Sequence, residues 1–170
     1  MLLDFKKYIF VFTTLFLSSC RGEDESDLQK IDQVLNIYIK NAEGKDLLNT
    51  NIPGGFTAVR AQDLNADRAL QDITGISVKK DQDTIAYVDY ATGAVRILKD
   101  SISASQKMYQ SDFYINLSKI VNKETVTDVD TVKVEYNWSP NLFQVSKVWY
   151  NNKLSFSKVE GQPNIIHIVK

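Results

Sequence analysis

Short segments that alternate between apolar and polar residues constrain the fold of this chain more than any other sequence feature. In residues 34–40, VLNIYIK, one face of an extended chain would carry Leu35, Ile37 and Ile39. In residues 131–138, TVKVEYNW, every second residue is valine, tyrosine or tryptophan. Side chains alternate between the two faces of a β-strand, so this pattern predicts strands that bury one face.

Two hairpins are predicted from strand-like segments that flank turn residues. Residues 84–98 contain two such segments around Gly93, where a turn needs glycine. Residues 143–158 contain two more around Asn151 and Asn152, and asparagine tolerates the left-handed conformation of a tight turn. Both hairpins are expected to be antiparallel.

The remaining segments complete a β-rich pattern of about nine strands. Further strand candidates lie at residues 56–61, 75–79, 113–117 and 164–169. Residues 63–72 are compatible with a short helix, and residues 101–111 are polar and expected to be irregular. The prediction is an all-β fold, an antiparallel β-sandwich (Ig-like or similar) with minor helical turns.

Residues 1–19 are predicted to be a signal peptide rather than part of this fold. Lys6 and Lys7 give the basic start, and the uncharged apolar run YIFVFTTLFL follows at residues 8–17. This run is too short for a membrane-spanning helix, which needs about 20 residues.

Leu17-Ser18-Ser19-Cys20 comes next and resembles the lipobox of bacterial lipoproteins. The resemblance implies cleavage between Ser19 and Cys20, a diacylglyceryl thioether on the Cys20 thiol, and acylation of the new amino group, for example with palmitate. Cys20 is also the only cysteine in the chain, so it has no partner for an internal disulfide. The alternative is an ordinary secretory peptide with an incidental cysteine.

The polar stretch after Cys20 separates the predicted anchor from the predicted domain. Residues 20–30 are expected to form a flexible acidic linker, and residues 31–170 the β-sandwich. RGEDESD at residues 21–27 resembles the acidic surface-export signal of Bacteroidota lipoproteins, which implies a domain on the outer face of the outer membrane. A solvated linker at the periplasmic face is the alternative.

Two later segments resemble small envelope lipoproteins of Bacteroidota. They are GKDLLN at residues 44–49, and the stretch 130–154, which begins with DTV and ends with VWYNNKL. These motifs are structural rather than chemical. The resemblance therefore supports a place at the cell envelope and implies no active site.

The charge of the chain argues against a nucleic-acid partner. Loss of residues 1–19 would remove Lys6, Lys7 and Asp4, leaving 18 basic and 20 acidic residues and a formal charge of −2. Nucleic-acid-binding domains usually carry a strongly basic patch. The expected membrane contact is the lipid anchor alone.

Candidate catalytic and metal-binding groups are few. The only histidine, His167, is expected to face solvent on a strand, and no G-x-S-x-G motif accompanies it. One histidine and one cysteine make a zinc site improbable, and residues 63–74 lack the glycine and glutamate of a calcium loop. No spacing singles out a pair of carboxylates. We predict no catalytic residue, no metal and no cofactor.

Aromatic residues are the candidate ligand contacts. Trp138, Trp149 and Tyr150 could stack on a sugar or anchor a protein if they are exposed. Trp138 shares a face with Val132 and Val134, which favours core packing, and Trp149 and Tyr150 must point to opposite faces of a regular strand.

Three tripeptides, D-T-I, D-S-I and D-T-V, resemble the O-glycosylation acceptor of exported Bacteroidota proteins. The corresponding acceptors would be Thr84, Ser101 and Thr131. The alternative is that Asp-Thr and Asp-Ser simply open strands.

These observations lead to three functional hypotheses. The first is a non-enzymatic lipoprotein that binds a glycan or a protein at the cell surface. The second is a structural or assembly subunit of an outer-membrane complex. The third, which has the least support, is a small glycan hydrolase.

Overall fold

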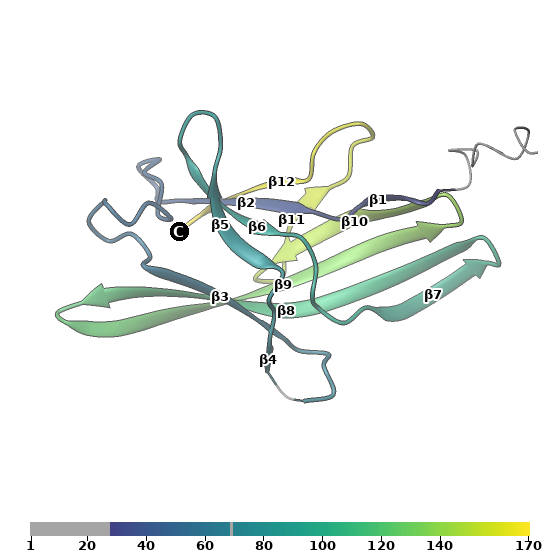
Figure 1. Ribbon diagram of the computed structural model, residues 1–170, viewed down its shortest axis with the longest axis horizontal. Coiled ribbons are helices and arrows are strands. Elements are labelled where there is room, and N and C mark those ends of the chain that lie inside the picture. The colour runs from purple at the N-terminus through teal and green to yellow at the C-terminus, as the bar shows by residue number, and fades with distance from the viewer. Residues whose placement is uncertain (1–27, 69) are drawn as a thin grey trace, which may run out of the picture.

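Twelve strands build the described part of the chain, residues 28–68 and 70–170 of a computed structural model (Figure 1). No helix occurs among these residues. The predicted signal peptide, Ser19 and Cys20 lie outside them. The strands are β1 (Lys30–Asp32), β2 (Leu35–Lys40), β3 (Ala58–Asp63), β4 (Gln71–Asp72), β5 (Ile76–Lys80), β6 (Ala86–Tyr90), β7 (Ile97–Ser103), β8 (Gln106–Val121), β9 (Glu124–Ser139), β10 (Leu142–Tyr150), β11 (Lys153–Ser157) and β12 (Ile165–Val169).

The strands form two sheets that pack on one another, which confirms the predicted all-β, sandwich-like fold. The large sheet has the order β1-β10-β9-β8-β3-β4, with β11 also paired to β10 and β7 also paired to β8. The small sheet has the order β12-β2-β6-β5. Figure 1 shows the small sheet lying over one part of the large sheet, while β8 and β9 run the length of the molecule.

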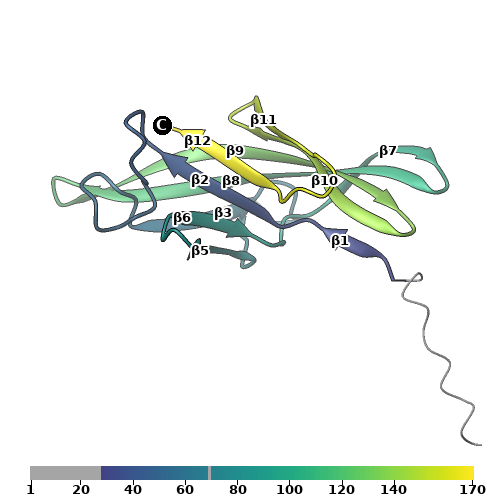
Figure 2. The same cartoon turned by 90° about the horizontal axis from the view of Figure 1, so that it is seen from above.

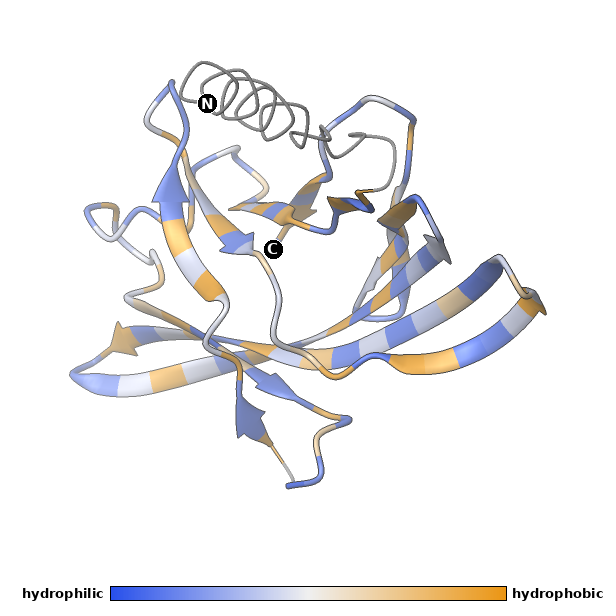
Figure 3. Ribbon diagram, turned by 45° about the vertical axis from the view of Figure 1, so that its right-hand side comes forward, coloured by the Kyte–Doolittle hydropathy of each residue, from blue (hydrophilic) through white to orange (hydrophobic). Residues whose placement is uncertain are grey.

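The core lies between the sheets and follows the alternation of the sequence. Leu35, Ile37 and Ile39 of β2 are fully buried, as are Phe113 of β8 and Val134 of β9. Figure 3 shows the resulting bands of apolar and polar residues along the strands. Each such side chain stabilises the fold by about 1.5–3 kcal/mol when it leaves water.

Both sheets contain a parallel pair, so the predicted purely antiparallel arrangement is wrong. β1 pairs in parallel with β10, and β12 pairs in parallel with β2. Figure 2 shows β12 running beside β2 in the same direction. Because these partners are far apart in the sequence, no short turn joins them, and their pairing could not be predicted from a turn motif.

The hairpin of β8 and β9 is much longer than the short strands predicted for this region. Each strand has 16 residues, and residues 101–111, expected to be irregular, lie at the end of β7 and the start of β8. All of β7 is exposed, so it lacks the alternation that marks a half-buried strand.

The hairpin predicted at residues 84–98 does not form, because its two arms belong to different sheets. β6 pairs with β2 and β5, whereas β7 pairs with β8. The connection crosses between the sheets, and the amide of Ala94 donates to Tyr90 Oη at 3.2 Å. Gly93 has a φ of +129°, and a Cβ there would approach Ile73 to 2.5 Å. This glycine therefore serves a close crossing rather than a hairpin turn.

Asp63 ends β3, residues 64–68 form bends and Gln71–Asp72 form β4, so the described residues of this segment do not form the expected helix. Asp63 is buried, and its carboxylate accepts hydrogen bonds from the amides of Asn65 at 2.8 Å and Val95 at 2.6 Å. An aspartate that caps a turn in this way competes with helix formation.

The hairpin predicted around Asn151 and Asn152 is confirmed. β10 and β11 pair antiparallel, and the two asparagines have φ angles of 47° and 63°. The fold also begins slightly earlier than expected. Gln29 donates to the carbonyl of Ser139 at 2.7 Å and Lys30 opens β1, so both residues, predicted to be linker, belong to the folded part.

Candidate functional site

A cleft opens where β11 and β12 approach each other without pairing, since β11 pairs only with β10 and β12 only with β2. We call it the β11–β12 cleft. Its volume is about 510 Å³. One wall is formed by residues 150–151 and 153–155 of the β10–β11 hairpin, and the other by residues 167–169 of β12 and by Lys170. The cleft thus joins the edges of the two sheets.

A buried carboxylate, Asp130, lies beneath this cleft and is 2% exposed. It accepts hydrogen bonds from Tyr150 Oη at 2.5 Å and from Asn151 Nδ2 at 2.6 Å. Lys170 Nζ lies 2.5 Å from Asp130 and 2.6 Å from Asp128. Three donors therefore surround Asp130, as a buried charge requires.

The pKa values of the donors follow from this arrangement. Burial, and then the hydrogen bond to Asp130, raises the pKa of Tyr150 above its usual range. Burial alone would lower the pKa of Lys170, but its hydrogen bonds to Asp128 and Asp130 outweigh burial and raise it. Tyr150 is therefore neutral and Lys170 charged at neutral pH.

A row of aromatic rings ends at the rim of the cleft. On the outer face of the small sheet, the Tyr38 ring centroid lies 5.3 Å from that of Tyr87 and 5.2 Å from that of His167. Tyr38 points outward because it alternates with the buried Ile37 and Ile39. The rings are tilted by 31° and 33° and pack against one another. His167 both ends this row and lines the cleft.

Of the three predicted stacking residues, only Tyr150 lines the cleft, and its ring is not available. Tyr150 is 4% exposed and its hydroxyl is bound to Asp130, so the predicted stacking role of Tyr150 is wrong. The alternation explains this outcome: Tyr150 points into the core with Val148, and Trp149 points to the opposite face.

Both tryptophans are half-buried, lie away from the cleft, and are covered by lysine. Lys133 Nζ lies 3.8 Å from the centroid of the Trp149 ring, and Lys107 Nζ lies 4.9 Å from that of Trp138. Trp138 packs against the core, as its shared face with Val132 and Val134 predicts. A cation over an aromatic ring takes the face that a ligand would use.

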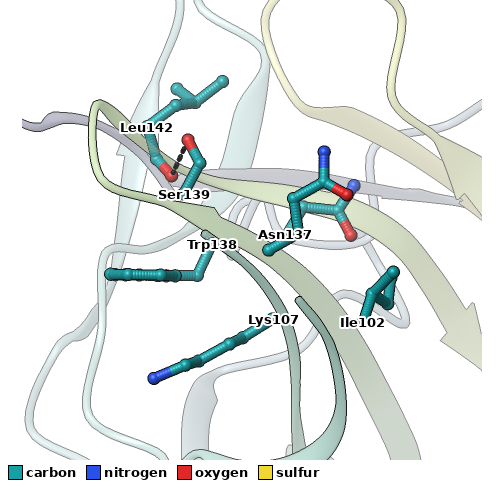
Figure 4. A pocket seen from close by; sticks show the side chains of 7 residues that line it. Ile102, Lys107, Asn137, Trp138, Ser139 and Leu142 are labelled. Carbon is teal, nitrogen blue, oxygen red and sulfur yellow. Dashed lines mark hydrogen bonds between the residues drawn. The ribbon is translucent and has the colours of Figure 1, made fainter. Parts of the chain in front are cut away.

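A separate hollow of about 240 Å³ is lined by Trp138 together with Ile102, Gln106, Lys107, Asn137, Ser139 and Leu142. Figure 4 shows Trp138 and Lys107 pointing to one side of the strands, with Asn137 and Ile102 on the other side. This matches the alternation of residues 137 and 138 along β9. Trp138 is thus the predicted stacking residue that lines this hollow, and Lys107, which lies over its ring, lines it too.

The three predicted glycosylation acceptors lie in different surroundings. Thr84 is exposed in a turn with a φ of 63°, and Ser101 is exposed in β7. Thr131 is half-buried, and its hydroxyl lies 3.4 Å from Asn151 Oδ1. Thr84 and Ser101 are accessible, whereas Thr131 is partly covered.

Metal-binding geometry is absent from residues 28–68 and 70–170, where no three His, Cys, Asp or Glu side chains gather in a suitable group. The paired aspartates of the sequence serve other contacts. Asp81 Oδ1 accepts hydrogen bonds from the amides of Asp83 and Ile85, and Asp128 contacts Lys170. Within the same described residues, no helix has the length and apolar character needed to cross a membrane.

The sequence pattern does not reveal the β11–β12 cleft. Alternation in VLNIYIK does place Tyr38 on the outer face, and it places His167 on the face opposite Ile166. The approach of β11 to β12 is a tertiary contact between different sheets, and no local motif encodes it. Lys153 and Ser155 therefore could not be recognised as cleft residues.

No family model, curated protein or solved structure matches this chain. The functional argument therefore depends on the geometry described above.

Proposed function

We propose that this protein is a membrane-anchored, non-enzymatic binding module that holds a glycan unit in the β11–β12 cleft. The observation that carries the proposal is the position of His167, which ends the aromatic row at the rim of a cleft of about 510 Å³. Cavities that hold small ligands usually have volumes of about 300–1,000 Å³.

The lining of the cleft suits a sugar. Ser155 and Lys153 supply hydroxyl and amine groups for sugar hydroxyls, and Leu154 and Ile168 supply apolar surface. The exposed His167 ring can pack against the C–H groups of a pyranose. Both kinds of contact are needed by a ligand that is polar at its rim and apolar on its ring faces.

The charges near the cleft are close to balanced. Lys170 is neutralised by Asp128 and Asp130, which leaves Lys153 as the free cation at the cleft among the described residues. A neutral or weakly anionic sugar therefore fits better than a highly charged ligand.

The same geometry argues against a glycan hydrolase. Hydrolysis by two carboxyl groups requires both to reach the scissile bond from positions about 5–10 Å apart. Asp130 is 2% exposed and is held by three donors, so it has no access to a ligand.

A glycan array probed with the full chain tests the proposal. For a glycan that binds, we expect His167→Ala to weaken affinity about twofold to twelvefold, because a lost ring contact costs about 0.5–1.5 kcal/mol. The matched control is Trp149→Ala, which removes a larger aromatic ring that the sequence also offered as a candidate for stacking on a sugar. Loss of binding in Trp149→Ala with full binding in His167→Ala would place the site elsewhere.

The proposed location is the outer membrane, with the lipid on Cys20 as the anchor and the domain at the cell surface. The supporting observations are the lipobox and the acidic residues that follow it. A periplasmic orientation is the alternative.

A further inference from the structure

The far end of the β8–β9 hairpin projects beyond the rest of the molecule. In Figure 1 it extends to the left of both sheets, opposite the end at which the described chain begins. Residues 121–129 are exposed on both faces. They include three large apolar side chains, Val121 at 42%, Val126 at 46% and Val129 at 53% exposure.

One edge of this hairpin has no partner strand among the described residues. β10 covers β9 only as far as the pair Tyr150–Val132, and the last backbone–backbone hydrogen bond along this edge runs from the Asn151 amide to the Thr131 carbonyl at 2.9 Å. Residues 124–129 pair with β8 alone. We call these six residues the free edge of β9.

The register shows which backbone groups the free edge presents. Val121 and Glu124 flank a two-residue turn, so they form a hydrogen-bonded pair. Hydrogen-bonded and non-hydrogen-bonded pairs then alternate along the ladder. The amide and carbonyl groups that point away from β8 therefore belong to Thr125, Thr127 and Val129.

The side chains of the free edge define the chemistry of a partner. Glu124, Val126 and Asp128 share one face, and no lysine or arginine occurs from Glu124 to Asp130. Lys170 contacts one oxygen of Asp128, whose side chain remains 50% exposed. Opposite charges on directly facing residues stabilise a strand pair, and like charges destabilise it.

We propose that the free edge of β9 binds an extended segment of another protein, whose facing side chains run basic, apolar, basic. The segment adds a strand to the large sheet, in line with β10, and its backbone bonds to Thr125, Thr127 and Val129. Its two cations lie opposite Glu124 and Asp128, and its central apolar residue lies opposite Val126. This surface adjoins the β11–β12 cleft, because Lys170 lines the cleft and contacts Asp128 of the free edge.

The charge pattern favours such a partner over a second copy of the same edge. Two free edges placed antiparallel with Val126 at the centre would bring Glu124 of one copy opposite Asp128 of the other, which is repulsive. The exposed edge strand β7 of the same sheet has irregular register near Leu98–Asp100 and Ser101–Ser103. Such bulges obstruct strand addition, whereas the free edge of β9 has a regular ladder.

The test uses the full chain and a capped peptide with the alternating sequence Lys-Thr-Val-Thr-Lys. We expect the peptide to protect the amides of Thr125, Thr127 and Val129 from hydrogen exchange. A peptide with glutamate in place of both lysines should bind at least tenfold more weakly. Equal binding of the two peptides, or no protection at these three amides at millimolar peptide, would overturn the proposal.

Two variants at one position separate edge pairing from other binding modes. Thr127→Pro removes an outward amide but no hydrogen bond of the β8–β9 ladder, and proline is tolerated on strand edges. We expect it to reduce peptide affinity at least tenfold, while Thr127→Val, which keeps the amide, binds normally. Exchange at Val134 reports whether each variant is folded. Equal affinities of two folded variants would contradict strand addition.

Discussion

The burial of Asp130 could not be predicted from the residues next to it in the sequence. In the chain it stands beside Thr131 and resembles an ordinary strand-opening aspartate. In the fold it is 2% exposed and receives hydrogen bonds from Tyr150 and Asn151, which lie about 20 residues away, and an ion pair from Lys170. Because every partner is distant in sequence, local patterns could not predict its burial.

Tyr150 should make stability depend on alkaline pH. Its pKa is raised in the fold, so above about pH 10 the unfolded chain releases the phenol proton while the folded chain retains it. The unfolded state then binds fewer protons, and the free energy of unfolding falls as pH rises. Below about pH 10, Tyr150 makes its full contribution to the free energy of unfolding.

The variant Tyr150→Phe isolates this effect. At neutral pH we expect a loss of about 1–3 kcal/mol, because Asp130 loses a buried donor. Between about pH 9 and pH 11, the free energy of unfolding measured in urea should fall less steeply in the variant than in the parent. Parallel curves for the two proteins would show that Tyr150 does not cause the dependence.

The alternation of side chains along a strand correctly predicted which face each tryptophan lies on. It places Trp138 with the core residues Val132 and Val134, and it separates Trp149 from Tyr150. It says nothing of Lys107 and Lys133, which come from neighbouring strands and cover the rings. Exposure of an aromatic face therefore needs the pairing partners as well as the strand.

At the scale of elements, the sequence predicted a hairpin correctly where the turn residues themselves determine the structure. The Asn151-Asn152 turn formed as expected, because asparagine accepts positive φ and the flanking strands alternate. The apparent hairpin at residues 84–98 failed because its arms pair with strands from other parts of the chain. Two strand-like arms and a glycine do not distinguish a turn from a crossing between sheets.

The two ends of strand β9 should differ in their stability against local opening. Val126 and Val134 have the same place in the ladder, since both pair with β8 through the hydrogen-bonded positions. Val134 is fully buried between the sheets, whereas Val126 is 46% exposed on the projecting hairpin. Few buried contacts hold the outer part closed.

Native-state hydrogen exchange measures this difference. We expect the Val126 amide to exchange at least about 100-fold faster than the Val134 amide, because local opening frees only the former. Because Val126 and Val134 are the same residue type and have the same kind of position in the ladder, each serves as the control for the other. Similar exchange rates at both positions would mean that the hairpin opens only with global unfolding.

For the whole molecule, the sequence predicted the class of fold but not its assembly. Parallel addition of β1 and β12 to the two sheets joins distant parts of the chain. Near one such junction, Lys158 Nζ lies 2.6 Å from Asp32 and 2.9 Å from Asn164 Oδ1. These long-range contacts have no signature in composition or periodicity, and the β11–β12 cleft exists only because of them.

The proposed lipid anchor concerns the whole protein and can be measured directly. Mass spectrometry of the protein extracted from its native membrane should show loss of residues 1–19 and added diacylglyceryl mass on Cys20. A Cys20→Ser variant should leave the membrane fraction, since it lacks the thiol that carries the lipid. An unmodified thiol at Cys20 in the native protein would contradict the proposed anchor.

The long β8–β9 hairpin has a further consequence under the proposed anchor. With the proposed anchor at Cys20, residues 121–129 would lie at the end of the molecule farthest from the start of the described chain. A large molecule that approaches such an anchored protein would meet these residues before the cleft.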